Sequence, residues 1–274
     1  MLVRPLLSRF CYYEFDYKKY TVDVGLNINY LNDSNTNEIF PGLYLRGETY
    51  LVPKILRAYA GVTGELQKNT LKTLSYENLF LGNNLSYENP YAWTFYGGMN
   101  GSFKRFVEYG IKLQHEIISD QYLFVSDTNE LRNFTMVYDD MVRFTFSGEM
   151  KFDVNQNLDI GFRGNVYSYK TNSEAEAWHL PSYDAAAFAT IRLADKIYIN
   201  GGYFATSSRK ARDLRGDTYS LDAINDVNVG MEYRYKKNIS GFVNVNNILN
   251  QRYEIWNNYR AQGLNVLAGV TFSL

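Results

Sequence analysis

Histidine and carboxylate side chains are the first candidates for chemistry in this sequence. It contains two histidines, His115 and His179, and the pair Asp139-Asp140 could join His179 in an acid–base hydrolytic site. Such a site needs an imidazole that a carboxylate orients at hydrogen-bond distance. The first acidic residue after His179 is Asp184, which lies five residues further on in another part of a predicted strand. No serine stands in a recognisable nucleophile context either, so we predict that the protein is not an enzyme and has no catalytic residue.

The sequence predicts no metal or cofactor site. The acidic pairs Asp213/Asp217 and Asp222/Asp226 lack the regular spacing of a calcium loop. A single cysteine, Cys11, excludes an intrachain disulfide and a cysteine-based zinc cluster. The stretch "GGMNG" is followed by none of the residues of a nucleotide-binding loop, so its glycines predict close packing or a bend in a strand.

Composition excludes several further classes of protein. The chain has 274 residues, a net charge of −1 and a pI of about 6.2, so nothing points to a nucleic-acid partner. Aromatic residues make up 16%, with 25 tyrosines and 5 prolines. No run approaches the roughly 18 to 20 apolar residues of a membrane-spanning helix. The opening "MLVRPLLSRFCYYEF" is no convincing secretory signal, because Arg4 and Arg9 interrupt its apolar stretch.

Apolar and polar residues alternate along most of the chain. In "YTVDVGLNINY" (20–30), "MVRFTFSGEMKFD" (141–153) and "DVNVGMEYRYK" (226–236), every second residue is apolar and the residues between are polar or charged. A period of two is typical of β-strands and fits no helical template. Several of these strands run longer than the usual five to six residues of a globular sheet, and a tilted membrane-spanning strand needs about 9 to 11.

The connections between the strands come in two alternating kinds. Short ones fall near residues 16–18, 52–54 and 102–105, whereas long polar ones fall near 67–90 and 119–140. Short turns at one rim and long loops at the other are typical of an outer-membrane β-barrel, with the short turns in the periplasm. We therefore predict an all-β protein whose fold is an antiparallel transmembrane β-barrel in contact with outer-membrane lipid.

Counting the strands back from the C-terminus gives about thirteen. The predicted ranges are 2–15, 17–31, 40–51, 55–66, 91–103, 105–118, 141–153, 156–169, 181–193, 196–206, 221–236, 238–248 and 263–274, with a strand extension or hairpin possible over 119–140. A complete bacterial barrel of one chain has an even number of strands. We therefore expect residues 1–274 to be the C-terminal part of a larger barrel domain, with the signal peptide outside this chain. The last strand is expected to close that barrel, paired on both sides.

Charged residues of both signs share one parity of the predicted strands. They include Glu108, Lys112, Glu116, Arg143 and Glu149, whereas His115 has the opposite parity. An Arg or Lys facing lipid at the midplane costs about 2–4 kcal/mol, so the charged parity is predicted to line a lumen. Mixed signs allow these groups to pair with each other, with a plug or with water, and favour a filled interior over an ion-selective pore.

Aromatic residues gather at the strand ends. Tyr167, Tyr169, Trp178 and Tyr183 flank one long loop, and Phe15, Tyr17, Phe152, Tyr233, Tyr235 and Phe272 lie toward the short turns, which predicts two interfacial girdles. Trp178, Trp256, Tyr259 and Arg260 are also candidates for ligand contact in the loops. Interfacial anchoring is the alternative interpretation of the three aromatic residues.

The closing stretch "VNVNNILNQRYEIWNNYRAQGLNVLAGVTFSL" resembles the last two strands of TonB-dependent outer-membrane receptors. Asn246-Asn247-Ile248-Leu249-Asn250, Tyr253, Gly263 and Thr271-Phe272-Ser273-Leu274 occupy the places of the family's motif, with Leu274 where a terminal Phe is commoner. The stretches at 56–81, 137–150 and 178–184 are similar to receptor barrels of Bacteroidetes.

This resemblance implies a 22-stranded barrel, an upstream plug domain, contact with the TonB complex through that N-terminal region, and uptake of a scarce nutrient such as an iron chelate, vitamin or glycan. It also allows a surface lipoprotein as a partner. The alternative from another class is a plug-free barrel that acts as a passive pore, an adhesin or a structural partner in an outer-membrane complex.

Overall fold

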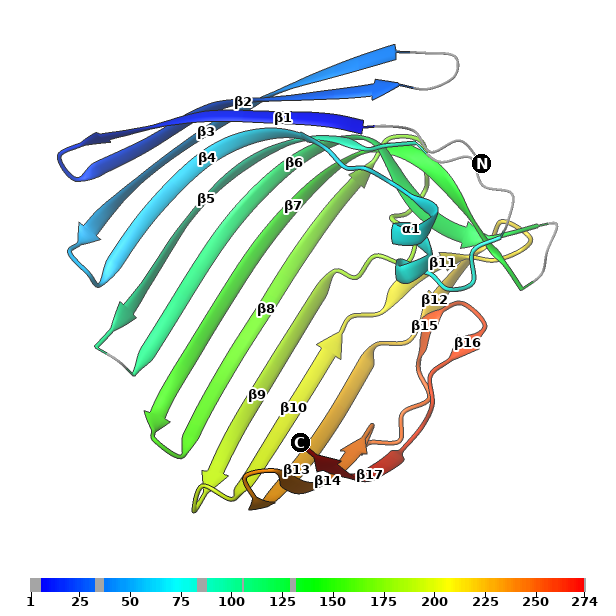
Figure 1. Cartoon of the computed structure of the whole chain (residues 1–274). Helices are drawn as coiled ribbons and strands as arrows, with labels where there is room; N and C mark the ends of the chain where they lie inside the picture. Colours follow the sequence, from blue (N-terminus) through cyan, green and yellow to red (C-terminus); the bar gives the residue numbers. More distant parts are fainter. Residues whose placement is uncertain (1–5, 33–36, 83–87, 105, 129–131, 274) are drawn as a thin grey trace.

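A single antiparallel sheet of thirteen strands dominates the structure, which is a computed structural model (Figure 1). The structure describes residues 6–32, 37–82, 88–104, 106–128 and 132–273. The strands of the large sheet are β1 (Leu6–Tyr17), β2 (Tyr20–Asn32), β3 (Asn37–Val52), β4 (Leu56–Leu66), β5 (Tyr91–Phe103), β6 (Val107–Ser126), β7 (Phe134–Asn155), β8 (Leu158–Thr171), β9 (Tyr183–Leu193), β10 (Ile197–Thr206), β13 (Ile224–Lys236), β14 (Ile239–Asn246) and β17 (Asn265–Phe272).

The strands of this sheet are hydrogen-bonded in the order in which they occur in the chain, from β1 to β10 and then β13, β14 and β17. The predicted number of strands is therefore confirmed, and so are most of their bounds. Residues 2–5 of the first predicted strand and residue 274 of the last lie outside the described residues. Among the described residues, β17 pairs with β14 alone and β1 pairs with β2 alone, so pairing of the last strand on its second side remains a prediction about the larger barrel.

The sheet is strongly curved, with β1 and β17 at its two edges (Figure 1). On the apolar face the side chains are widely exposed; Leu26, Ile28 and Val270 are 58%, 48% and 76% exposed. On the polar face Asn27 and Asn29 are buried among their neighbours. Side chains converge on the inside of a curved sheet and diverge on its outside, so the polar face is the concave one. The apolar face is the convex one and has the character of a lipid-facing wall.

The long connections carry the remaining elements. These are α1 (Leu71–Glu77), the hairpin β11–β12 (Arg209–Arg212 and Thr218–Leu221) and the hairpin β15–β16 (Glu254–Trp256 and Tyr259–Arg260). They gather at the end of the sheet opposite the short turns (Figure 1). None of the residues that the structure describes belongs to a helix long and apolar enough to cross a bilayer.

The aromatic residues divide between the two faces differently from the prediction. Near the short turns, Tyr17, Tyr235 and Phe272 lie on the convex face, as an interfacial girdle requires. Near the long loops, Tyr167 and Tyr169 lie on the concave face, where the Tyr167 hydroxyl donates to the Asp184 carboxylate at 2.6 Å and that of Tyr169 to the Pro181 carbonyl at 3.0 Å. The girdle prediction is therefore wrong for these two tyrosines, because the strand parity turns them toward the polar face.

Candidate functional site

The upper parts of β6 and β7 form the centre of a cluster of long loops. A bulge between Ile118 and Gln121, with Asp120 at a φ of 56°, interrupts the register, and the two strands then pair on from Gln121↔Asp139 to Ser126↔Phe134. In Figure 1 this extension turns away from the wall toward β11–β12 and β15–β16. The run "YLFV" (122–125) is apolar without alternation, and all four side chains are buried. A strand with two buried faces needs protein on both sides.

The first face of the extension is covered by the loop of α1 and by the β15–β16 loop. Leu74 of α1 is 1% exposed and packs with Phe124 and Phe134. The Trp256 ring meets Phe124 and Phe134 at centroid distances of 5.1 and 5.6 Å, in edge-to-face geometry. Aromatic pairs of this kind contribute about 0.5–1.5 kcal/mol beyond the burial of their area. The two loops are therefore fixed to the same strand surface, although they are far apart in the sequence.

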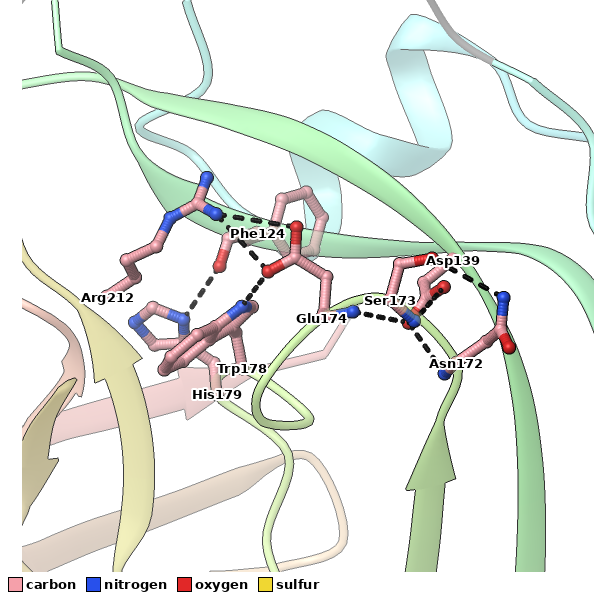
Figure 2. Close-up of polar contacts among 8 residues, drawn as sticks. All are labelled: Phe124, Asp139, Asn172, Ser173, Glu174, Trp178, His179 and Arg212. Atoms are coloured by element: carbon pink, nitrogen blue, oxygen red, sulfur yellow. Dashed lines mark hydrogen bonds and ion pairs between the residues drawn. The ribbon is translucent and has the colours of Figure 1, made fainter. Parts of the chain in front are cut away.

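The second face is covered by the loop between β8 and β9. Trp178 is 3% exposed and packs on Leu123 and Val125. Its indole Nε1 donates to the Glu174 carboxylate at 2.7 Å, and Arg212 of β11 forms an ion pair with the same carboxylate at 3.2 Å (Figure 2). Glu174 thus links this loop to the β11–β12 hairpin.

The start of the β8–β9 loop is held by one carboxylate. Asp139 of β7 accepts hydrogen bonds from the backbone N–H groups of Asn172, Ser173 and Glu174, each at 2.9 Å (Figure 2). Burial alone would raise the pKa of Asp139, but these N–H groups outweigh it and hold the pKa of the carboxyl below its ordinary value. The ionised carboxylate is therefore part of the loop's structure.

His179 lies where four loops meet. It adopts a left-handed backbone conformation with a φ of 62°, and its N–H donates to the Lys210 carbonyl of β11 at 2.7 Å. Its Nδ1 lies 3.0 Å from the Phe124 carbonyl oxygen, so this nitrogen carries the proton (Figure 2). Its ring contacts Phe134 and Trp256. Burial lowers the pKa of His179 to about 4, so the imidazole is neutral at pH 7.

Arg209 joins the same junction to the β15–β16 loop. Its guanidinium donates to the carbonyl oxygens of Glu254 and Ile255 at 2.5 and 2.9 Å. The side chain is 5% exposed, and no carboxylate among the described residues forms an ion pair with it. These contacts join five segments into one packed unit, which we call the loop cluster. The segments are the α1 loop, the β6–β7 extension, the β8–β9 loop, the β11–β12 hairpin and the β15–β16 hairpin.

The sequence-predicted site residues lie in or on this cluster. Trp178 is in its interior, Trp256 packs in the aromatic group, and Tyr259 stacks on Phe80 at 3.4 Å and donates through its hydroxyl to the Arg132 carbonyl. Arg260 lies at the surface with its side chain 72% exposed and pairs with Glu254 at 3.4 Å. Contact with a ligand remains a prediction for these four residues. The interfacial interpretation is wrong for Trp178 because that side chain is enclosed by protein.

Sequence reasoning did not find Asp139, Glu174 or Arg209 as structural residues of the loops. The apolar run at 122–125 indicates a strand that is covered on both faces, and it was the one feature of the sequence that pointed to packed loops here. The partners on those faces come from loops that no local pattern connects.

The hydrolytic interpretation of Asp139, Asp140 and His179 has no geometric support. Both oxygens of Asp139 accept backbone N–H groups, and the His179 ring is bounded by aromatic rings and the Phe124 carbonyl. Asp184 binds Asn165 and Tyr167 on the wall. Across the described part of the chain, no group of three or more His, Cys, Asp or Glu side chains is placed to hold a metal ion.

The concave wall below the cluster carries paired charges. Arg143 and Glu116 lie opposite each other on β7 and β6 and form two hydrogen bonds at 2.6 and 2.9 Å. Arg192 and Asp159 pair at 2.5 Å on β9 and β8. The predicted pairing of lumen charges across strands is confirmed for these residues, so the wall has no strong field of one sign.

Aromatic rings lie flat along the same wall over glycines. Tyr59 is opposite Gly98 and Tyr96 is opposite Gly61 on the paired strands β4 and β5. A Cβ atom at Gly98 would lie 2.6 Å from the Tyr59 hydroxyl oxygen and 2.4 Å from the Ile111 carbonyl oxygen. The predicted close packing around "GGMNG" is thus present at Gly98.

Sequence comparison and structure comparison give different results for this chain. No family model matches the sequence, and no curated protein matches it either. Among solved structures, the chain is similar to the pyoverdine outer membrane receptor FpvA from Pseudomonas aeruginosa PAO1, with a TM-score of 0.74, 11% identity, and coverage of 98% of this chain and 42% of the receptor. It is also similar to the ferric-catecholate import receptor Fiu from E. coli K12, with a TM-score of 0.74, 10% identity, and coverage of 97% and 44%.

A third similar structure is the copper transporter OprC, with a TM-score of 0.72, 13% identity, and coverage of 98% of this chain and 47% of that one. The fold of this chain is therefore that of part of an outer-membrane β-barrel. More narrowly, it is the fold of part of the barrel of two outer-membrane receptors and a copper transporter, and the chain spans less than half the length of each of these three. The particular similarity to receptors of Bacteroidetes remains a prediction.

Proposed function

We propose that this chain is the barrel part of a TonB-dependent outer-membrane receptor that takes up a scarce nutrient, with an iron chelate as the favoured class. The observation that carries the proposal is the match of 97–98% of the chain to a pyoverdine receptor, a ferric-catecholate import receptor and a copper transporter. The convex apolar wall, the concave wall of paired charges and the packed loop cluster at one rim agree with it.

The remaining strands and a plug domain belong, in this proposal, to the rest of the same polypeptide. Two observations support it: the described residues leave β1 and β17 each paired on one side, and the chain spans 42–47% of the receptors compared above. Unpaired strand edges are unstable in a bilayer, because no water is present to bind the free N–H and C=O groups. The complete open reading frame tests this part directly.

The transport function is tested by uptake of a radiolabelled iron chelate into cells with and without the gene. We expect uptake to depend on the gene, on TonB and on the proton gradient, so that a protonophore abolishes it. Gene-dependent uptake that survives the protonophore, together with steady conductance in a planar bilayer, would instead identify a passive pore. A surface lipoprotein partner would find apolar contacts at Tyr76 and Leu79 near α1, which are 76% and 78% exposed.

A further inference from the structure

The short-turn rim of the sheet carries a row of lysines. Six lysines and one aspartate, Asp195, stand among the described residues that link the strands there, and five of the six short turns contain a lysine. The lysines are Lys18, Lys19, Lys54, Lys104, Lys196 and Lys237. All six are exposed. The long loops at the other rim mix acidic and basic residues, and the strand ends beside the short turns carry Asp16 and Asp153, so the bias toward lysine belongs to the short turns themselves.

Several of these lysines lie over aromatic rings. The Nζ atoms of Lys18, Lys19 and Lys104 lie 5.2, 5.4 and 5.6 Å from the ring centroids of Tyr17, Tyr20 and Phe103. Lys236, the last residue of β13, repeats the arrangement at 5.5 Å from Tyr235. A cation within about 6 Å of a ring face is attracted to it. Four ammonium groups are therefore held beside aromatic rings of the convex wall.

The rings place these charges at a defined depth. Tyr17, Tyr20, Phe103 and Tyr235 share the convex parity with the apolar wall and are 46–61% exposed. Aromatic residues at that position mark the level of the lipid headgroups. The lysine ammonium groups thus lie at the height of lipid phosphates and on the side of the wall that faces lipid.

Three of these lysines stand at a left-handed position of their turn, as Ala194 and Asp195 do in the turn between β9 and β10. Lys18, Lys54 and Lys104 have φ values of 55°, 62° and 55°. This left-handed conformation suits Gly, Asn or Asp better than other residues.

We propose that the short-turn rim is a binding surface for anionic phospholipids of the periplasmic leaflet, with the lysine–aromatic pairs as its phosphate contacts. Anionic lipid attracts basic groups close to the membrane surface, and the attraction falls off within a Debye length. Lipid is favoured over a soluble anionic partner because the lysines are held on rings of the lipid-facing wall. The inference rests on the outer-membrane placement in the proposed function.

The test compares lipid selectivity in the protein extracted from outer membranes and reconstituted in phosphatidylethanolamine bilayers. Spin-labelled phosphatidylglycerol and phosphatidylcholine report the relative association constant for the lipid shell around the protein. We expect a preference for phosphatidylglycerol that weakens with salt and falls severalfold, toward one, in the variant K18Q/K19Q/K104Q/K236Q.

Two further variants separate this surface from general charge and from misfolding. The variant K68Q/K72Q/K210Q/R215Q removes the same charge from the long loops and should keep the preference. Replacing Lys18, Lys19, Lys104 and Lys236 by Arg keeps the charge and should keep the preference as well.

The proposal is overturned if the native protein shows no preference, if both glutamine variants lose it equally, or if the four lysines govern binding of soluble peptidoglycan fragments and leave lipid selectivity unchanged. Absence of the protein from the outer-membrane fraction would refute the proposed function itself. A protein that lies in that fraction and imports its chelate without lipid selectivity would refute this inference alone.

Discussion

Replacing Asp139 by Asn removes a charge from the loop cluster and almost no volume. The carboxylate is 6% exposed and accepts the N–H groups of Asn172, Ser173 and Glu174 at 2.9 Å. One of its oxygens accepts all three groups, and the other accepts Ser173 alone. An amide can supply only one of these two acceptors and turns an NH₂ group toward the Ser173 N–H.

The magnitude follows from the type of hydrogen bond. Bonds to a charged group contribute about 1.5–3 kcal/mol each and neutral ones about 0.5–1.5 kcal/mol, so three bonds lose about 1 kcal/mol each. Relaxation of the loop recovers part of this, and we expect the local free energy of opening to fall by about 2–3 kcal/mol. Since 1.4 kcal/mol corresponds to a factor of ten, the three amides should exchange about 30–150 times faster.

Hydrogen exchange with mass spectrometry measures this on a peptide that spans residues 172–174. Asp140→Asn is the matched control, because that carboxylate accepts a single contact from the Asp120 N–H at 3.3 Å. The lowered pKa of Asp139 also sets the pH dependence. Its stabilisation is present above the ordinary Asp pKa and is lost as the pH falls through the lower pKa of the folded state. Equal exchange in the two variants, or protection in Asp139→Asn at the native level, would refute this account of the loop.

Three further predictions concern the junction and the wall. The free energy of opening of the loop junction should fall by up to about 3 kcal/mol as the pH falls from 6.5 to 4. The reason is that His179, with a pKa of about 4, binds its proton less readily in the folded than in the unfolded state. Hydrogen exchange of the backbone amide of residue 179 measures this fall, and the variant His179→Leu should show no pH dependence of the opening free energy. Glu116→Gln should lower the unfolding temperature in detergent, since Arg143 loses a carboxylate that binds it at 2.6 and 2.9 Å. We expect the free energy of unfolding to fall by about 1–3 kcal/mol. An unchanged unfolding temperature would contradict a role of this ion pair in stability. Gly98→Ala should reduce the folded fraction, because the new Cβ atom would lie 2.4 Å from the Ile111 carbonyl oxygen. The control Gly148→Ala should leave the folded fraction unchanged, because its Cβ would have no atom within 4 Å. Equal folded fractions of the two variants would contradict close packing at Gly98.

The strands of the wall could be predicted because one local rule governs them. Lipid on one side and a polar interior on the other impose a period of two, so Val24, Leu26 and Ile28 identify their own environment. The same rule places Glu116 and Arg143 on the polar face, where they pair on the neighbouring strands β6 and β7.

The loop cluster could not be predicted in this way. A tryptophan in a loop can lie at an interface, bind a ligand or pack in a core, and its residue type does not distinguish these environments. For Trp178 and Trp256 the environment is set by the side chains that pack against them. Those partners come from distant segments, such as Leu123 and Val125 for Trp178, and Phe124 and Phe134 for Trp256. Asp139 was visible as an acid, but its backbone partners are set by the path of a loop.

Because both faces of the β6–β7 extension are buried in protein, we expect its apolar residues to tolerate substitution less well than the apolar residues of the convex wall. Apolar residues of the convex wall are solvated by lipid, so exchange of one apolar side chain for another there leaves no cavity. Phe124, Leu123 and Phe134 are 4%, 1% and 2% exposed and meet only protein, so truncation there opens a void. Sequence change in the cluster is then constrained as it is in the core of a soluble domain: one loop cannot be exchanged unless the loops packed against it change as well.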